Sequence, residues 1–303
     1  MATDNGSTRQ VVVLDAPSNL GLRPPAPGTV PGCYKLAGAV RDCGFVDRIN
    51  AADAGYLTPP RYDRGDWQPG DGVFNAAAIA SYSARLADRV GLLLDQGRFP
   101  VVLGGECSIL LGPALALRRR GRYGVVYADG HSDFRHTGNA PHVGAAGGEA
   151  LALVTGRGQP DLADLESLAP YVQGNDAALV GIREDDEYVD DVREAGVLVF
   201  EAQQIISDPA GAAAAVLGRV ERDDIDGFWV HLDVDILDAV VMPAVDSPDP
   251  GGLDHAQLRE LLRPILASPK CAGVDIGIFD PDLDPDGRLA AELTDTLVAV
   301  LTD

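Results

Sequence analysis

Short apolar runs alternate with longer helical segments along almost the whole chain. The runs are continuously apolar and rich in β-branched residues, which is typical of strands that are covered on both faces. We predict strands at residues 11–14, 100–103, 124–128, 177–182, 197–200, 228–233 and 273–279. We predict helices at residues 75–96, 108–119, 209–222, 254–266 and 288–301.

This alternation predicts an α/β fold, in which a mostly parallel sheet lies between layers of helices. The sequence shows no internal repeat, and no Ser/Gly-rich or charged linker is long enough to separate domains. We therefore predict a single domain over residues 1–303, with a polar, frayed terminus at residues 1–9. In sheets of this kind, ligands bind beyond the carboxyl ends of the strands.

Composition narrows the classes of partner. The 303 residues are 46% hydrophobic, which suffices for a large core, and the formal net charge of −22 argues against nucleic acid. The same acidity attracts cations, so a metal ion or a cationic small substrate is a natural partner, although much of it serves solubility. No apolar run approaches the roughly 20 residues that cross a bilayer. The four cysteines form no CxxC pair and no secretory signal is visible, so we predict a reduced, cytoplasmic protein.

The first polar cluster follows the strand predicted at residues 100–103. Its sequence is Gly104-Gly105-Glu106-Cys107-Ser108. Paired glycines after a buried strand suit a tight turn with a close backbone approach, and Ser108 is expected to cap the following helix. Taken alone, this cluster is explained by a turn and a cap.

Two further clusters follow the strands at residues 124–128 and 228–233. Asp129, His131 and Asp133 alternate along the chain, and so do Asp233 and Asp235. In an extended chain this period places each set on one side. A solvated turn could explain one such cluster, but two in one chain favour a bound divalent cation, because gathered buried charges are costly without compensation. Imidazole with carboxylates suits Mn, Fe or Zn.

In this order and spacing, the three clusters resemble the arginase/agmatinase (ureohydrolase) family across nearly the whole chain. The family signatures are Gly-Gly-Glu-His-Ser, Asp-Ala-His-x-Asp and Ser-x-Asp-x-Asp. The second and third clusters read Asp129-Gly130-His131-Ser132-Asp133 and His231-Leu232-Asp233-Val234-Asp235, and the first departs from the family at Cys107. The resemblance implies a three-layer αβα sandwich with a mostly parallel sheet of about eight strands. It also implies an arginase-family hydrolase that acts on linear amidine C–N bonds with two divalent ions, usually manganese.

The resemblance implies a set of metal ligands by position. Site A would comprise Cys107, Asp129, Asp133 and Asp233, and site B would comprise Asp129, His131, Asp233 and Asp235, with the two aspartates shared by both sites bridging the ions. A metal-bridging hydroxide would attack the substrate carbon, and Asp133 would relay the proton. Cys107 replaces an imidazole with a soft ligand, so zinc or iron becomes possible beside manganese. A small buried thiol beside a weak or empty site A is the alternative.

The resemblance also implies contacts with the substrate. Residues 137–142 resemble the arginase segment Ser-Gly-Asn-x-His with one residue inserted. Thr137 and Asn139 are therefore candidates to bind a substrate carboxylate, and His142 is a candidate general acid. Because the insertion blurs the register, an ordinary loop histidine is the alternative.

Three residues in other loops match family positions around the substrate. Ser247 matches a threonine near the reacting group, Asp246 stands where arginases have glycine, and Asp186 matches an aspartate that binds the α-amino group. Each could equally be a solvated loop residue. At Ile278, arginases carry a glutamate that pairs with the substrate guanidinium. The substrate is therefore expected to be a less basic relative, such as an N-hydroxyguanidine, unless Asp246 or Asp280 takes over this role.

The resulting hypothesis is a metal-dependent hydrolase that cleaves a C–N bond of a guanidino or N-hydroxyguanidino substrate and releases urea or a substituted urea. A mononuclear deacetylase-like amide hydrolase and a degenerate metal-binding relative without catalysis are the alternatives. We expect a cationic or amino-acid-like substrate, neither nucleic acid nor membrane as a partner, and a homo-oligomer, as a trimer or hexamer. His231 is expected to be a strand residue that faces a helix, without a chemical role.

Overall fold

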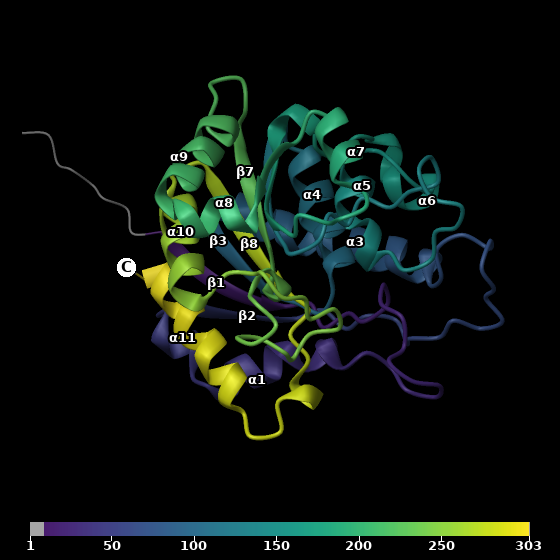
Figure 1. Ribbon diagram of the computed structural model, residues 1–303, viewed down its shortest axis with the longest axis horizontal. Helices are drawn as coiled ribbons and strands as arrows, with labels where there is room; N and C mark the ends of the chain where they lie inside the picture. The colour runs from purple at the N-terminus through teal and green to yellow at the C-terminus, as the bar shows by residue number, and fades with distance from the viewer. Residues whose placement is uncertain (1–8, 303) are drawn as a thin grey trace, which may run out of the picture.

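The computed structural model describes residues 9–302, and one eight-stranded sheet lies at its centre (Figure 1). The strands are β1 (Gln10–Asp15), β2 (Ala52–Tyr56), β3 (Arg98–Leu103), β4 (Tyr123–Ala128), β5 (Ala177–Ile182), β6 (Leu198–Glu201), β7 (Gly227–Asp233) and β8 (Cys271–Gly277). Their order is β2-β1-β3-β8-β7-β4-β5-β6, and each neighbouring pair is parallel. The predicted α/β class with a parallel sheet is confirmed.

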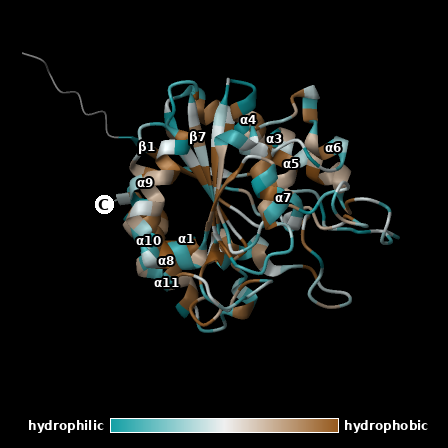
Figure 2. Ribbon diagram, turned by 45° about the horizontal axis from the view of Figure 1, so that its top comes forward, coloured by the Kyte–Doolittle hydropathy of each residue, from teal (hydrophilic) through white to brown (hydrophobic). Residues whose placement is uncertain are grey.

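Two layers of helices cover the sheet (Figure 1). One layer contains α1 (Leu36–Asp42), α8 (Ala202–Ser207), α9 (Pro209–Val220), α10 (His255–Ala267) and α11 (Arg288–Thr302). The other contains α3 (Ala76–Asp95), α4 (Leu111–Arg118), α5 (Ala150–Val154), α6 (Pro160–Ala163) and α7 (Val189–Glu194). Figure 2 shows apolar strands in the interior and polar surfaces on the outer sides of the helices. Among residues 9–302, none of the helices combines the length and hydropathy that crossing a membrane requires.

The differences from the predicted elements have simple physical reasons. The apolar pattern anticipated every strand except β2, an edge strand that contains Asp53 and Gly55 and is largely exposed or half-buried. An edge strand needs no continuous apolar cover, so it lacks the pattern that marks β7, which is buried at every residue. Helices of one or two turns, such as α5 and α7, are too short to show a period. The helix predicted at residues 108–119 begins instead with a 3-10 turn, Cys107–Leu110, before α4.

The frayed terminus predicted at residues 1–9 lies outside the described residues except for Arg9, and for Arg9 the prediction was wrong. Its guanidinium donates to the carbonyl oxygens of Leu266 at 2.7 Å, Ser268 at 2.5 Å and Cys271 at 3.0 Å. It also lies over the Phe99 ring, 4.2 Å from the centroid. These contacts tie the start of β1 to the segment between α10 and β8.

The four central strands, β3, β8, β7 and β4, end side by side. Leu103 of β3 pairs with Ile276 of β8, and Leu232 of β7 pairs with Ala128 of β4. The polar clusters that follow β3, β4 and β7 therefore meet at one edge of the sheet. The chain leaves β4 toward β5 and leaves the neighbouring β7 toward β8, so the strand order changes direction between these two strands, which is where parallel α/β sheets place their ligands.

The loop between β4 and α5 carries much of this edge and contains a buried carboxyl group. Glu149 is completely buried, and the Gly144 N–H donates to its Oε1 at 2.9 Å. Its other oxygen, Oε2, has no hydrogen-bond partner. Burial therefore raises the pKa of Glu149 to about 7, although the hydrogen bond from Gly144 acts in the opposite direction.

We predict that Glu149→Gln changes how stability depends on pH. The folded-state pKa of about 7 lies above the ordinary value of 4.5, so the contribution of Glu149 to stability is lost as the pH rises through this interval. Glutamine has no proton to lose. Relative to the wild type, the variant should gain about 3 kcal/mol in the free energy of unfolding between about pH 4.5 and pH 7.5, measured by urea unfolding.

The matched control is Glu194→Gln at an exposed position of α7. This variant should leave the free energy of unfolding close to that of the wild type, because the side chain of Glu194 is exposed. If Glu149→Gln also follows the wild type, Glu149 ionises as readily in the folded chain as in the unfolded chain, and the account of its burial is wrong.

Candidate metal centre

The carboxyl end of β4 places Asp129 and His131 at the centre of the site. The Asp129 N–H continues the ladder by donating to the Val180 carbonyl at 3.0 Å, and Asp129 Oδ1 accepts from the His131 N–H at 2.6 Å. A side chain at Gly130 would collide with the Asp235 carbonyl at 2.8 Å. Glycine at this position therefore allows the ends of β4 and β7 to approach each other closely.

The paired glycines after β3, Gly104 and Gly105, also allow a close approach of two backbone segments. A Cβ at Gly105 would lie 1.7 Å from the Ser18 carbonyl oxygen, so this turn packs directly on the segment after β1. The prediction that Ser108 caps the next helix was wrong. The capping residue is Glu106, whose Oε2 accepts from the Ser108 N–H at 2.9 Å, while the Ser108 hydroxyl donates to Glu106 Oε1 at 2.7 Å. Cys107 is thereby held at the sheet edge.

The side chains at this edge form two groups with metal-ligating potential. The inner group consists of Cys107, Asp129, His231 and Asp233, which are all buried, and the outer group consists of Asp129, His131 and Asp235. Within each group, one potential ligand atom from every residue lies within 4.8 Å of the others. Asp129 belongs to both groups. The two groups therefore form one continuous centre.

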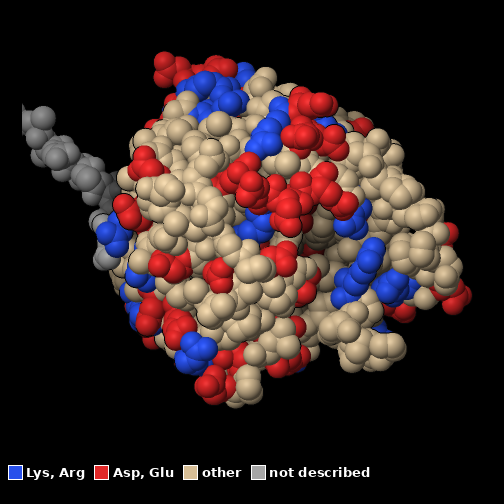
Figure 3. All heavy atoms as spheres, in the orientation of Figure 1, with Lys and Arg blue, Asp and Glu red and all other residues tan. Residues whose placement is uncertain are grey.

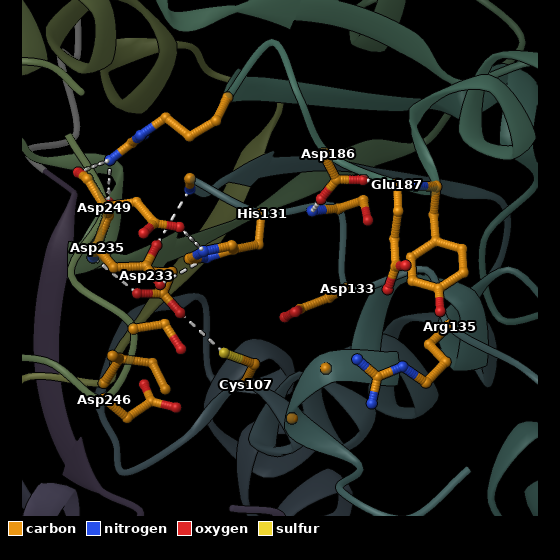
Figure 4. A pocket seen from close by; sticks show the side chains of 18 of the residues that line it. Cys107, His131, Asp133, Arg135, Asp186, Glu187, Asp233, Asp235, Asp246 and Asp249 are labelled. Atoms are coloured by element: carbon orange, nitrogen blue, oxygen red, sulfur yellow. Dashed lines mark hydrogen bonds and ion pairs between the residues drawn. The ribbon is translucent and has the colours of Figure 1, made fainter. Parts of the chain in front are cut away.

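Direct contacts show how closely the groups are packed. In the inner group, Cys107 Sγ donates to Asp233 Oδ2 at 2.9 Å. In the outer group, His131 Nδ1 lies 2.9 Å from Asp235 Oδ2, and its Nε2 lies 3.1 Å from Asp249 Oδ2 (Figure 4). The sequence predicted that these strand ends meet, and the structure brings Cys107, Asp129 and Asp233 together in one group and Asp129, His131 and Asp235 together in the other.

The electrostatics of the centre show what its buried carboxylates lack. Burial, followed by the charge of Asp235, raises the pKa of Asp129 to about 7. Burial and the neighbouring carboxylates also raise the pKa of Asp233 well above its usual range. At Asp235 burial acts in the same direction, but the hydrogen bond and charge of His131 outweigh it and lower the pKa. The charge of His131 thus offsets the burial of Asp235 on the outer side, whereas burial dominates at Asp129 and Asp233.

Two buried atoms of the inner group have no hydrogen-bond partner. They are Asp129 Oδ2 and His231 Nε2. Buried polar atoms are rarely left unpaired, and each unpaired group costs about 1–3 kcal/mol. A divalent cation would satisfy both atoms and offset the gathered negative charge. The residues present therefore fit the metal ions that their pattern predicts.

A cavity of about 480 Å³ opens beside the two groups. Its walls include Cys107, Asp133, Arg135, Asp185, Asp186, Glu187, Asp246, Ser247, Asp249 and Ile278. Figure 4 shows Asp133 pointing into the space between Cys107 and Asp233 on one side and Arg135 and Glu187 on the other. Acidic side chains also gather near the middle of the face shown in Figure 3. The cavity is therefore suited to a polar ligand that carries positive charge.

The structure brings the predicted substrate residues Asp186, Asp246 and Ser247 to this cavity. Asp186 accepts from the Ser132 N–H at 2.9 Å and the Tyr188 N–H at 2.8 Å, so its carboxylate is held in place. Burial raises the pKa of Asp246 to about 6. Asp246 and Asp280 were the two candidates to replace the missing glutamate. Of these two, Asp246 lines the cavity.

The predicted residues of the loop after Asp133 lie elsewhere. Within residues 9–302, neither Thr137 nor His142 is among the residues that line the cavity, and both side chains are exposed. Asn139 donates to Asp191 Oδ2 at 2.7 Å and to the Phe134 carbonyl at 3.0 Å, which are contacts within the fold. The structure does not bring these three residues to the reacting centre.

Sequence reasoning missed three residues that shape the centre. His231 was expected to face a helix, whereas its ring lies in the inner group beside the Tyr127 ring. Asp275 of β8 accepts from His231 Nδ1. The buried Arg183 guanidinium donates to the carbonyl oxygens of Asp235 at 2.8 Å and Leu237 at 3.1 Å, and so fixes the turn after β7. For His231 and Asp275, the one signal in the sequence was the presence of an aspartate, Asp275, in the apolar run of β8.

The chain is similar to known proteins over nearly its whole length. The model of the arginase family matches residues 11–301. A formimidoylglutamase of Aeromonas salmonicida is 32% identical over 261 residues, which are 85% of this chain and 77% of that protein. An arginase of Bacillus caldovelox is 25% identical over 292 residues, which are 93% of this chain and 95% of that protein. A solved structure of arginase from Bacillus caldovelox superimposes with a TM-score of 0.86 at 24% identity, covering 97% of this chain and 99% of that chain.

We predict that Cys107→His changes the metal content of the centre. Imidazole is a harder ligand than thiolate, so manganese occupancy should rise and the preference for zinc over manganese should fall. Metal content after dialysis against equal concentrations of both ions, measured by mass spectrometry, tests this prediction. Cys271→Ser, at a buried thiol that contacts the Gly273 carbonyl, is the control and should leave the content unchanged. Unchanged occupancy and preference in Cys107→His would show that the thiol does not touch a metal.

Proposed function

The chain belongs to the arginase family, whose members hydrolyse amidine and guanidino C–N bonds, and on this premise we propose that it cleaves a guanidino or N-hydroxyguanidino substrate that resembles an amino acid. The observation that carries this proposal is the pair of ligand groups that share Asp129 beside an acidic cavity. Hydrolysis would release urea or a substituted urea together with an amine.

The family uses a binuclear divalent metal centre, usually manganese, and the side chains at the sheet edge would hold it. We propose Asp129 as the shared ligand, His131 and Asp235 as further ligands on the outer side, and Cys107 and Asp233 on the inner side. When bound, the ions would supply a nucleophile at neutral pH by lowering the pKa of coordinated water, and they would also polarise the substrate. The thiol makes zinc and iron candidates beside manganese.

Asp133 is the group that we propose for proton transfer. The Tyr127 hydroxyl donates to its Oδ2 at 2.5 Å, which orients the carboxyl group toward the cavity. Burial and the charge of Asp129 raise the pKa of Asp133 well above its usual range. A carboxylate in this position can take a proton from the attacking water and pass it to the leaving amine nitrogen.

The amino-acid part of the substrate would lie at the opposite side of the cavity. Asp186 uses each carboxylate oxygen for one backbone N–H, so each oxygen retains a lone pair for an α-amino group. Arg135 also lines the cavity and can bind an α-carboxylate. At the reacting end, Ile278 is apolar and Asp246 is acidic, and Ser247 adds a hydroxyl. Because Ile278 stands where arginases have a glutamate, this end offers a guanidinium one carboxylate fewer, which favours a less basic substrate.

One observation favours a second candidate, an N-formimidoyl amino acid. The formimidoylglutamase of Aeromonas salmonicida is 32% identical to this chain, and Arg135 provides a positive charge for an additional carboxylate. The same attack on an amidine carbon would then release formamide instead of urea. At the reacting carbon, the two candidates differ in one substituent.

We predict that the metal-loaded chain hydrolyses a guanidino or N-hydroxyguanidino amino acid. A panel containing both classes and N-formimidoyl amino acids, with urea, hydroxyurea and formamide measured separately, decides between the candidates. Formamide release alone would support the second candidate. Absence of turnover across the panel by a chain that holds two ions would contradict the proposed function.

We also predict that Asp186→Asn weakens substrate binding. Loss of one charge-assisted hydrogen bond should raise KM by about tenfold or more, because such bonds contribute about 1.5–3 kcal/mol. The value of kcat should change little, because this contact is the same in the ground state and the transition state. The control is Asp190→Asn, at an exposed residue of α7 that pairs with Arg193. An equal loss of kcat with unchanged KM would contradict the binding role of Asp186.

A further inference from the structure

We propose that His231 is a metal ligand of the inner group and that it occupies the coordination position expected for Asp133. The inner ion would then be held by Cys107, Asp129, His231 and Asp233. The inference rests on the metal-binding part of the proposed function and does not depend on the substrate. Its basis is the position of one buried imidazole, the partner of its Nδ1 and the absence of a partner for its Nε2.

The sheet places His231 beside the other ligands. His231 and Asp233 are two residues apart on β7, so they share one face of the sheet. On the neighbouring strand β4, Tyr127 pairs with His231 in register, and Asp129 follows at the strand end. The Tyr127 and His231 rings are stacked, with centroids 4.5 Å apart and an angle of 29° between their planes. This packing fixes the orientation of the imidazole.

The hydrogen bonds of Asp275 determine which ring nitrogen is available. Asp275 is completely buried; its Oδ2 accepts from His231 Nδ1 at 2.5 Å, and its Oδ1 accepts from Trp229 Nε1 at 2.6 Å. A neutral imidazole with its proton on Nδ1 carries a lone pair on Nε2. Metal-binding histidines commonly donate their other N–H to a carboxylate in this way. Asp275 is thus a positioning residue for His231.

The His231 ring lies at the centre, and one of its nitrogens is unpaired. His231 is completely buried and its Nε2 has no hydrogen-bond partner. A ring nitrogen of His231 lies within 4.8 Å of ligand atoms from Cys107, Asp129 and Asp233. If His231 were only a core residue, its unpaired Nε2 would destabilise the fold by about 1–3 kcal/mol with no compensating interaction. Coordination of an ion removes this cost.

Asp133 has a different environment. It belongs to neither ligand group among the described residues, and its Oδ2 is engaged by the Tyr127 hydroxyl. Its backbone has a φ of +45°, so the extended conformation expected from the alternation of Asp129, His131 and Asp133 does not continue to Asp133. With His231 in place, the inner group has four ligands without Asp133. Asp133 is then free for proton transfer.

The donor set predicts the chemistry of the inner ion. One thiolate, one imidazole and two carboxylate oxygens match the four-coordinate N/S/O sites of zinc and also suit ferrous iron. Manganese prefers oxygen-rich sites and would be weaker here. The outer group, with one imidazole and two carboxylates, lacks the sulfur. We therefore infer two unlike metal sites that share Asp129.

Two variants with opposite expectations test this inference by metal content. In His231→Asn, the amide nitrogen can still donate to Asp275, but the ligand at Nε2 is lost. We expect the inner ion to be bound more weakly by at least about tenfold, so that zinc content falls from two ions to one per chain after dialysis. In Asp133→Asn, both ions should remain. If Asp133→Asn loses an ion and His231→Asn retains two, the inference is wrong.

Cobalt substitution provides a second measurement that does not use activity. The wild type should show a sulfur-to-cobalt charge-transfer band from Cys107, and Cys107→Ser should lack it. In His231→Asn this band should be lost or shifted, whereas Trp229→Phe, which removes the other donor to Asp275, should keep it. An unchanged spectrum in His231→Asn would overturn the inference.

Zinc-edge X-ray absorption of the wild type covers the case in which His231→Asn fails to fold. Scattering from two imidazoles per two zinc ions supports the inference, because the outer group supplies only His131, and scattering from one imidazole overturns it. These results are separate from the proposed function. A wild type that binds two ions with two imidazoles but hydrolyses nothing in the substrate panel would disprove the function alone.

Discussion

Repulsion between gathered carboxylates is the constraint on which the rest of this structure depends. Two unit charges 4 Å apart interact by about 4 kcal/mol at the effective dielectric constant typical of protein sites. Asp129, Asp233 and Asp235 are buried at the ends of adjacent strands, so each added carboxylate increases the cost of folding. The parallel sheet nevertheless brings them together, because its central strands end at one edge. Bound divalent ions would convert this repulsion into attraction.

The chain differs from the family signatures at two positions that meet at one ion. The first signature has histidine where this chain has Cys107, and the third begins with serine where this chain has His231. The structure places both side chains in the inner group. The imidazole has thus not been lost from the centre but supplied from β7 instead of the turn after β3. Asp275 on β8 and Trp229 on β7 hold it in position.

The sequence predicted those parts of the site that depend on local spacing. Alternation at Asp129, His131 and Asp133, together with strand ends that must meet, is sufficient to predict a metal centre. The role of His231 was missed because its partner lies 44 residues later, and only the register between β7 and β8 shows the contact. His142 was misplaced because contacts such as Asn139 with Asp191 determine the path of its loop. Strand ends follow from topology, whereas loop paths follow from tertiary contacts.

The position of Asp129 in both ligand groups would link the binding of two ions thermodynamically. An ion bound on one side would withdraw electron density from the shared Asp129 carboxylate. It would also neutralise negative charge, so that the remaining carboxylates would hold fewer protons. The affinity of either side therefore depends on whether the other is filled, and the factor is the same in both directions. Loading should consequently follow a preferred order and release protons as it proceeds. The availability of each ion in the cell would then determine which mixed-metal form accumulates.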